Sequence, residues 1–176
     1  MAKDKAQIRR EWADAFAAQS RCDFQVYLKM PADVEDCHKL HYLQMAAEKI
    51  AKAYRLRDTQ MGLENAMTSH VAFSHFAMLM LMSSSTKTRY QGKDAWLQQT
   101  LRRVQGLARE IEKLAPSVDR QQSPANAEYP WAEGESIVTP CRHSYAVMVA
   151  LQSPNGNDFL RLLQEAINGY FSTQPA

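Results

Sequence analysis

A chain of 176 residues, 45% of them apolar, can bury a core of its own, so we expect one domain spanning residues 1–176. The 21 basic and 19 acidic residues give a formal net charge of +2, which excludes a strong single-sign field that would steer nucleic acid to the surface. Three cysteines exclude a dense disulfide framework, and the longest apolar run is too short to cross a bilayer, so we expect a cytoplasmic protein without membrane contact.

The first part of the chain predicts two amphipathic helices. Residues 5–28 lack Gly and Pro, and their apolar face, with one polar gap, predicts a first helix that ends before Pro31. Acidic residues at positions 33–36 offer a start for the second helix, because carboxylates complement the positive end of the helix dipole. The first face consists of Ile8, Trp12, Ala15, Gln19, Cys22 and Val26, and the buried stripe of the second helix consists of Leu40, Leu43, Ala47, Ile50 and Tyr54.

The middle of the chain predicts a connection and two further helices. Residues 57–65, which include Gly62, form the connection, and Thr68 or Ser69 caps an apolar third helix over residues 71–84. A fourth helix carries regularly spaced apolar residues from Leu97 to Ala115 and stops at Pro116.

Residues 116–154 contain five of the seven prolines and no sustained helical pattern, which indicates a functional or locally folded segment. Ile137 and Val138, followed by alternating apolar residues at 145–149, predict a short two-stranded ribbon there. A last helix begins near Asn157 or Asp158. The sequence therefore predicts an all-α, antiparallel up-and-down bundle of about five helices, with a long Pro-rich loop or small β-ribbon before the last helix.

Candidate metal ligands lie at the start of the second helix. Cys37 and His41 are four residues apart and share one helical face, and Cys141 with His143 would complete a zinc site if the Pro-rich segment folded back over them. The paired ligand spacings of zinc fingers and ribbons are missing. The alternative is that Cys37 packs in the core and His41 makes a local hydrogen bond.

The second helix also carries a polar face on the side away from its apolar stripe. Gln44, Glu48, Lys52 and Arg55 project together at 100° per residue. One interpretation is a solvated surface with a Glu48–Lys52 pair, and the other is a surface that binds a partner.

Three stretches of the sequence resemble one known family. Residues 43–53, with the sequence LQMAAEKIAKA, resemble the second-helix signature of the HEPN domains, the helical family named for nucleotide binding in higher eukaryotes and prokaryotes. Thr68-Ser69-His70 resembles that family's Thr-His before an apolar run, and residues 123–131 resemble the stretch before its last helix. The resemblance spans most of the chain.

The resemblance implies an up-and-down bundle, commonly dimerised through its helices, of the kind found in toxin–antitoxin modules and antiviral defence. Many members are metal-independent ribonucleases that use an Arg followed, after four to six residues, by a His. No arginine stands at that spacing before any of the five histidines, which are His38, His41, His70, His75 and His143. The family's ribonuclease motif is therefore missing from this chain, and its presence cannot be used to predict ribonuclease activity.

A ribonuclease site assembled from distant residues is the alternative, because RNA cleavage needs a base near neutral pKa and a cation for the phosphate. Arg142 beside His143, with Arg120, is the candidate catalytic set, although a strand would point residues 142 and 143 to opposite faces. Polar and stacking groups for binding come from Asn126, Tyr129 and Trp131.

No glycine-rich phosphate loop or dinucleotide fingerprint occurs, so no cofactor is expected. The preferred interpretation is a non-catalytic HEPN-like binding or accessory protein of a prokaryotic defence or toxin–antitoxin-type system. We expect it to act as a homodimer or with a protein partner through helical faces, with RNA or a nucleotide as candidate ligand. The alternatives are a divergent metal-independent ribonuclease toxin or effector, and a zinc-stabilised structural module.

Overall fold

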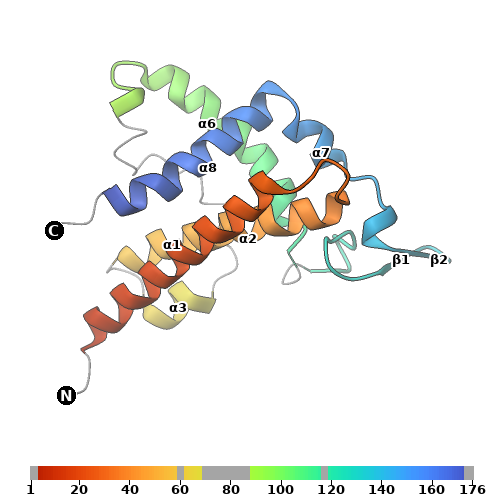
Figure 1. Cartoon of the computed structure of the whole chain (residues 1–176), viewed down its shortest axis with the longest axis horizontal. Helices are drawn as coiled ribbons and strands as arrows, with labels where there is room; N and C mark the ends of the chain where they lie inside the picture. Colours follow the sequence, from red (N-terminus) through yellow and green to blue (C-terminus); the bar gives the residue numbers. More distant parts are fainter. Residues whose placement is uncertain (1–3, 59–61, 69–87, 116–118, 173–176) are drawn as a thin grey trace.

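Two long helices, α1 (Lys5–Lys29) and α2 (Asp36–Arg57), form an antiparallel pair along the molecule (Figure 1). The side chain of Asp4 caps α1 by accepting a hydrogen bond from the backbone N–H of Gln7 at 2.6 Å. Both helices are confirmed close to their predicted ends. The structure is a computed structural model and describes residues 4–58, 62–68, 88–115 and 119–172.

Polar contacts fix the register of α1 against α2. The buried hydroxyl of Ser20 donates a hydrogen bond to the carbonyl of Ala46 at 2.6 Å. Lys49 Nζ lies 2.5 Å from the carboxylate of Asp23, which also accepts a hydrogen bond from the side-chain amide of Gln19 at 2.9 Å. Because both charged groups are mostly withdrawn from water, each needs the other to offset its desolvation.

Arg9 closes the far end of this helix pair. Its Nε donates a hydrogen bond to the carbonyl of Leu56 at 2.5 Å, and its Nη2 donates to the carbonyl of Asp58. The last carbonyls of a helix have no partner within the helix and carry partial negative charge. The guanidinium therefore stabilises the C-terminus of α2 from the first turns of α1.

The remaining described helices pack on this pair. The helices α6 (Asp94–Glu112) and α8 (Pro154–Ser172) lie side by side, and α8 also contacts α1 and α2 (Figure 1). The short helix α7 (Ala146–Leu151) joins them from one end, and α3 (Leu63–Thr68) follows α2.

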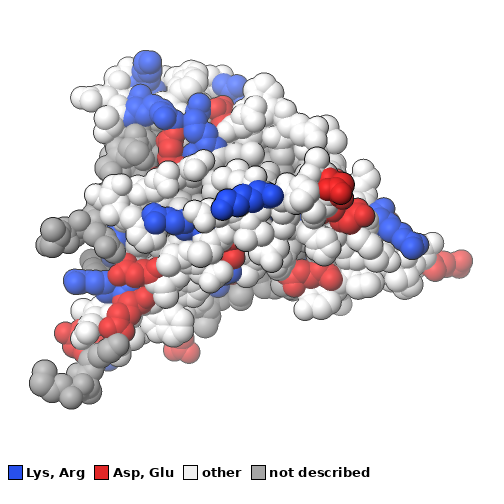
Figure 2. Space-filling view, in the orientation of Figure 1, with Lys and Arg blue, Asp and Glu red and all other residues white. Residues whose placement is uncertain are grey.

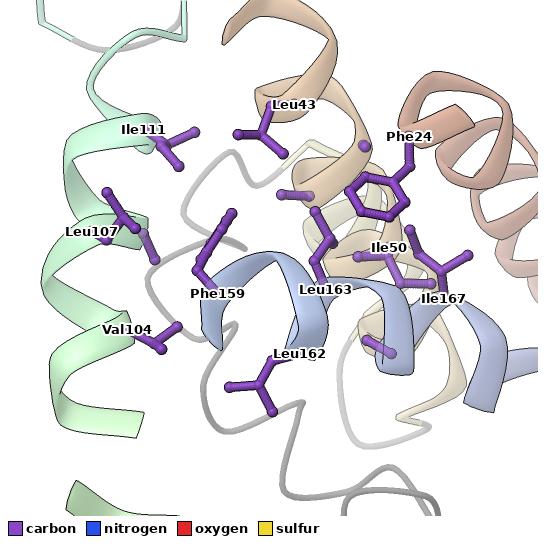
Figure 3. Packing of buried hydrophobic residues seen from close by; sticks show 14 of the residues in the cluster. Phe24, Leu43, Ile50, Val104, Leu107, Ile111, Phe159, Leu162, Leu163 and Ile167 are labelled. Atoms are coloured by element: carbon purple, nitrogen blue, oxygen red, sulfur yellow. The ribbon is translucent and has the colours of Figure 1, made fainter. Parts of the chain in front are cut away.

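One large cluster of buried apolar side chains joins these helices. Figure 3 shows Phe159 and Leu163 of α8 pointing toward Leu43 of α2 and Leu107 of α6. Burying each such side chain stabilises the fold by about 1.5–3 kcal/mol. The predicted all-α bundle is confirmed, and the fourth predicted helix corresponds to α6.

The corner between α7 and α8 depends on a glycine. Helix α8 begins at Pro154, earlier than the predicted start near Asn157, because proline is compatible with the first helical turn. Ser153 Oγ accepts a hydrogen bond from the backbone N–H of Gly156 at 3.3 Å. A Cβ atom at Gly156 would overlap the backbone of Leu151 at the end of α7, so a larger residue would force the two helices apart.

A small antiparallel ribbon projects from the bundle before α7. Strand β1 (Trp131–Glu133) pairs with β2 (Ser136–Val138), and Gly134 adopts a φ of 61° in the tight turn between them. The predicted ribbon is confirmed at 137–138, but its predicted second strand is wrong, because residues 146–149 belong to α7. A short alternating run also fits one helical turn, and here Val147 and Leu151, four residues apart, face the core.

The predicted connection over residues 57–65 is interrupted, since α3 begins at Leu63. The predicted third helix over residues 71–84 lies outside the described residues. Among the helices that the structure describes, none has the length and apolar character needed to cross a bilayer.

We expect Phe159→Ala to lower the free energy of unfolding by about 3–5 kcal/mol, because it opens a cavity at the centre of the cluster. Urea denaturation followed by far-UV circular dichroism measures this change. The control Val149→Ala removes an exposed apolar side chain of α7 and should cost less than about 0.5 kcal/mol. Equal effects of the two substitutions would contradict the core described above.

A second prediction concerns Tyr54, whose hydroxyl donates a hydrogen bond to the carbonyl of Ala166 at 2.9 Å. Burial raises the pKa of its phenol from 10.0 to about 12, and the nearby Arg57 opposes this shift. Because the folded pKa is the higher one, the stabilisation from the neutral phenol is complete below pH 10 and is lost as the pH rises toward about 12.

Absorbance titration of the phenolates in wild type and Tyr54→Phe measures this pKa. The difference between the two curves should be centred near pH 12, and wild-type stability should fall more steeply than that of the variant between pH 10 and 12. A difference curve centred on pH 10 would contradict the assigned burial.

Candidate functional site

The chain between α6 and α7 folds back over the first half of α2, at the end of the molecule that carries the ribbon (Figure 1). This segment contains a loop over residues 119–130, the ribbon, and the short 3-10 helix η2 (Pro140–Arg142). Helix η2 contacts α2, and His41 Nδ1 of α2 lies 3.2 Å from Glu128 Oε1 of the loop. The Pro-rich segment is therefore a folded part of the molecule, packed on a helix.

The buried side chain of Asn126 organises the loop. Its Nδ2 donates hydrogen bonds to the carbonyls of Pro124 at 3.2 Å and Tyr129 at 2.9 Å. Its Oδ1 accepts from the backbone N–H groups of Glu128 at 2.9 Å and Tyr129 at 2.6 Å. The hydroxyl of Tyr145 adds a bond of 2.8 Å to the backbone carbonyl of Asn126, which ties the loop to the start of α7.

Arg120 is the cation of the loop over residues 119–130. Its Nη1 donates hydrogen bonds to the carbonyls of Ser123 at 3.1 Å and Ala125 at 2.9 Å, and its Nη2 donates to the carbonyl of Ala115. Among the described residues, its Nε–H has no hydrogen-bond partner. Burial lowers the pKa of the guanidinium, and the carboxylate of Glu128 acts in the opposite direction. Arg120 is therefore a partly desolvated cation bonded mainly to neutral carbonyls.

Three aromatic rings hold the ribbon to the body. The ring of His143 lies edge-on to Trp131, at 5.0 Å between centroids, and to Tyr145, at 4.7 Å. Burial raises the pKa of the Tyr145 phenol, so its hydroxyl remains a neutral donor at physiological pH.

A pocket of about 400 Å³ opens between the loop and the first strand. This volume falls within the range of small-molecule sites. Tyr129, with 62% of its surface exposed, and Arg120 both line this pocket. The lining residues are Arg120, Pro124, Asn126, Tyr129, Pro130, Trp131 and Ala132.

The pocket thus brings together Arg120 and three residues predicted to bind, which are Asn126 and Tyr129 of the loop and Trp131 at the start of β1. Arg142 and His143 do not line it. They lie in η2 and at its end, not on a strand, and Arg142 is exposed while His143 is held between the two rings. Among the described residues, no hydrogen bond or ion pair joins Arg142 to His143.

The four candidate metal ligands come from segments that do meet. Cys37 and Cys141 are close enough for one to influence the pKa of the other, but burial is the main cause that raises the pKa of the Cys37 thiol and disfavours the metal-binding thiolate. His41 faces Glu128, and His143 contacts two rings. Within the described ranges, no group of three or more His, Cys, Asp or Glu side chains is placed to hold a metal ion.

The polar face of α2 is buried, which corrects its interpretation as an open surface. Gln44 and Lys52 are only 3% and 7% exposed. Glu48 accepts a hydrogen bond from Gln44 at 2.7 Å and pairs with Lys52 at 2.8 Å, while Arg55 is half-buried. Burial raises the pKa of Glu112 on α6, and the nearby Glu48 carboxylate raises it further. The 3.6-residue period identifies side chains that share a face but not what covers that face.

Sequence reasoning missed Glu128 and Tyr145, which hold the loop on α2 and α7. One available signal was Asn126, since asparagine often bonds to backbone groups two or three residues later. Nothing in the sequence indicates which tyrosine donates to the loop from the far side of the ribbon.

Comparison of the chain with protein-family models, with curated proteins and with solved structures found no match.

We expect Asn126→Asp to lower the free energy of unfolding by about 1–3 kcal/mol, because it removes two N–H donors and places a carboxylate against two carbonyl oxygens. Near-UV circular dichroism of Trp131 should report the loosened loop. The control Asn157→Asp lies exposed in the first turn of α8, where a carboxylate suits the helix dipole, and should be neutral within about 0.5 kcal/mol. A stable Asn126→Asp variant with an unaltered spectrum would contradict the role given to this amide.

Proposed function

We propose that the protein is a HEPN-like binding protein that holds a nucleotide, or one nucleotide of a single-stranded RNA, in the pocket between Arg120 and Trp131. The observation that carries the proposal is the lining of this pocket, which combines a partly desolvated guanidinium with two aromatic rings. Aromatic rings stack on bases of any sequence, and guanidinium groups bind phosphate. In this proposal the chain is a non-catalytic accessory protein of a prokaryotic defence or toxin–antitoxin-type system.

The hydrogen bonds of Arg120 support this assignment. Its Nη1 and Nη2 donate hydrogen bonds to carbonyls, which fix the plane of the guanidinium. Among the described residues its Nε–H has no hydrogen-bond partner, so it is available to a phosphate oxygen. A cation held in place before binding loses little entropy when a ligand arrives. Tyr129 is exposed enough for a base to cover its ring.

The charge of the chain supports a small ligand over a long nucleic acid. The net charge is only +2, and acidic and basic side chains alternate over the face drawn in Figure 2. Phosphate contacts along a strand need a basic track, and they dominate the affinity of proteins for long nucleic acids. A pocket of about 400 Å³ matches recognition of one nucleotide better.

A ribonuclease remains the second candidate, and one contact favours it. Glu128 Oε1 lies 3.2 Å from Nδ1 of His41, within ion-pair distance but not aligned as a hydrogen bond, and an imidazole beside a carboxylate is a common general base. The Glu128 carboxylate also lies near Arg120, a cation suited to a phosphate. This arrangement is a different one from the Arg142 and His143 pair considered from the sequence.

We expect fluorescently labelled oligo-uridine and unlabelled AMP to bind the wild-type protein competitively at low salt. Tyr129→Ala should weaken both by about 1–3 kcal/mol, or roughly 5- to 150-fold, because it removes a stacking ring. Fluorescence anisotropy measures the affinities. The control Trp96→Ala removes an exposed aromatic side chain of α6 away from the pocket and should leave them unchanged. Absence of wild-type binding, or equal affinity of the Tyr129→Ala variant, would reject the proposal.

The same RNA incubated with EDTA separates the two candidates. A binding protein leaves the RNA intact in wild type and in the His41→Ala and His143→Ala variants. Cleavage by wild type that is lost only in His41→Ala would establish a ribonuclease with His41 as its base. Cleavage that is lost only in His143→Ala would place the catalytic site at the end of η2 instead.

A further inference from the structure

Two cysteines belong to segments that meet where the chain folds back on α2. Cys37 lies in the first turn of α2, and Cys141 is the middle residue of η2. Cα atoms of η2 lie within 8 Å of Cα atoms of α2. A disulfide joins residues whose Cα atoms are about 4.4–6.8 Å apart, so it requires a close backbone approach of this kind.

The buried hydroxyl of Tyr145 lies near both thiols. Burial is the main cause that raises the pKa of this phenol, and Cys37, Cys141 and Asp36 raise it further. Charges shift a pKa in this way only over short distances. Cys37 and Tyr145 also belong to the same apolar cluster. The two thiols therefore lie at the base of the loop, where Tyr145 bonds to the carbonyl of Asn126.

We infer that Cys37 and Cys141 are a redox-active pair, which a peroxide converts into a disulfide that ties η2 to α2. The two thiols differ in their access to solvent, since Cys141 is exposed and Cys37 is only 2% exposed. Burial also raises the pKa of the Cys37 thiol, which disfavours the reactive thiolate. Cys141 therefore meets the oxidant, and Cys37 reacts second.

The reaction has two steps. The Cys141 thiolate attacks one oxygen of hydrogen peroxide, the O–O bond breaks, and a sulfenic acid forms while hydroxide leaves and is protonated to water. The sulfur of Cys37 then attacks the sulfur of Cys141, the S–O bond breaks, and the thiol proton leaves with the hydroxide as a second water. The two thiols lose two electrons, and these reduce the peroxide.

Hydrogen peroxide treatment of the Cys22→Ser protein tests the pair, because this change removes the third cysteine, which is exposed on α1. We expect both remaining thiols to disappear, and non-reducing peptide mapping to find residue 37 linked to residue 141 within one chain. Dithiothreitol should restore both thiols. A sulfinic acid at Cys141 beside a free Cys37 thiol, a link between two chains, or no loss of thiols would each overturn the inference.

The matched control adds Cys141→Ser to the Cys22→Ser protein. This variant has the same methionines, so it separates thiol chemistry from methionine oxidation. Its Cys37 should remain a free thiol under the same treatment, since burial shields it from the peroxide. Oxidation of Cys37 in this control at the rate seen with Cys141 present would contradict the order of the two steps.

Unfolding in urea tests whether the bond joins segments that already meet in the folded protein. Oxidation of the Cys22→Ser protein should raise the urea midpoint, because the link closes a loop of roughly 100 residues and restricts the unfolded chain. Dithiothreitol should reverse the rise, and the Cys141→Ser control should show none. A lower midpoint in the oxidised protein would mean that the link distorts the fold, and it would overturn the assignment. These outcomes do not depend on which ligand the pocket binds.

Discussion

The side-chain amide of Asn126 is the contact on which the pocket depends. It bonds to four backbone groups of its own loop, so the loop has one conformation without any regular secondary structure. In that conformation Tyr129 and Arg120 line the same pocket. Because Tyr145 donates to the backbone of Asn126 itself, the pocket is continuous with the helical core and not a separate appendage.

The charged residues of the bundle are largely used in holding it together. Asp23 and Lys49 join α1 to α2, Glu48 and Lys52 pair on a covered face, and Arg9 binds the end of α2. Each of these charged groups is bonded to another part of the bundle, and a ligand would have to break that contact in order to bind it. Arg120 likewise donates to neutral carbonyls, but it lines the pocket, and the nearby Glu128 offsets only part of the effect of its burial.

The helices could be predicted from sequence because their apolar spacing is regular, and α1, α2 and α6 lie where that spacing places them. What each face contacts could not be predicted. The apolar face of α1 lies outside, and Gln44 and Lys52 of α2 lie inside. Such outcomes depend on which helices pack together, and the period of a single helix carries no information on that. Asn126, Tyr129 and Trp131 line one pocket with Arg120, but this arrangement depends on a fold-back of the chain that no local pattern specifies.

The glycine at the corner of α7 and α8 allows the two helices to approach closely. Gly156 touches no part of the pocket, yet the absence of its side chain allows α7 to sit against the start of α8. Helix α7 begins directly after Tyr145, whose hydroxyl holds the loop. The conformation of the loop is therefore set in part by a residue in another helix, since a larger side chain at position 156 would displace α7 and, through Tyr145, the loop that lines the pocket.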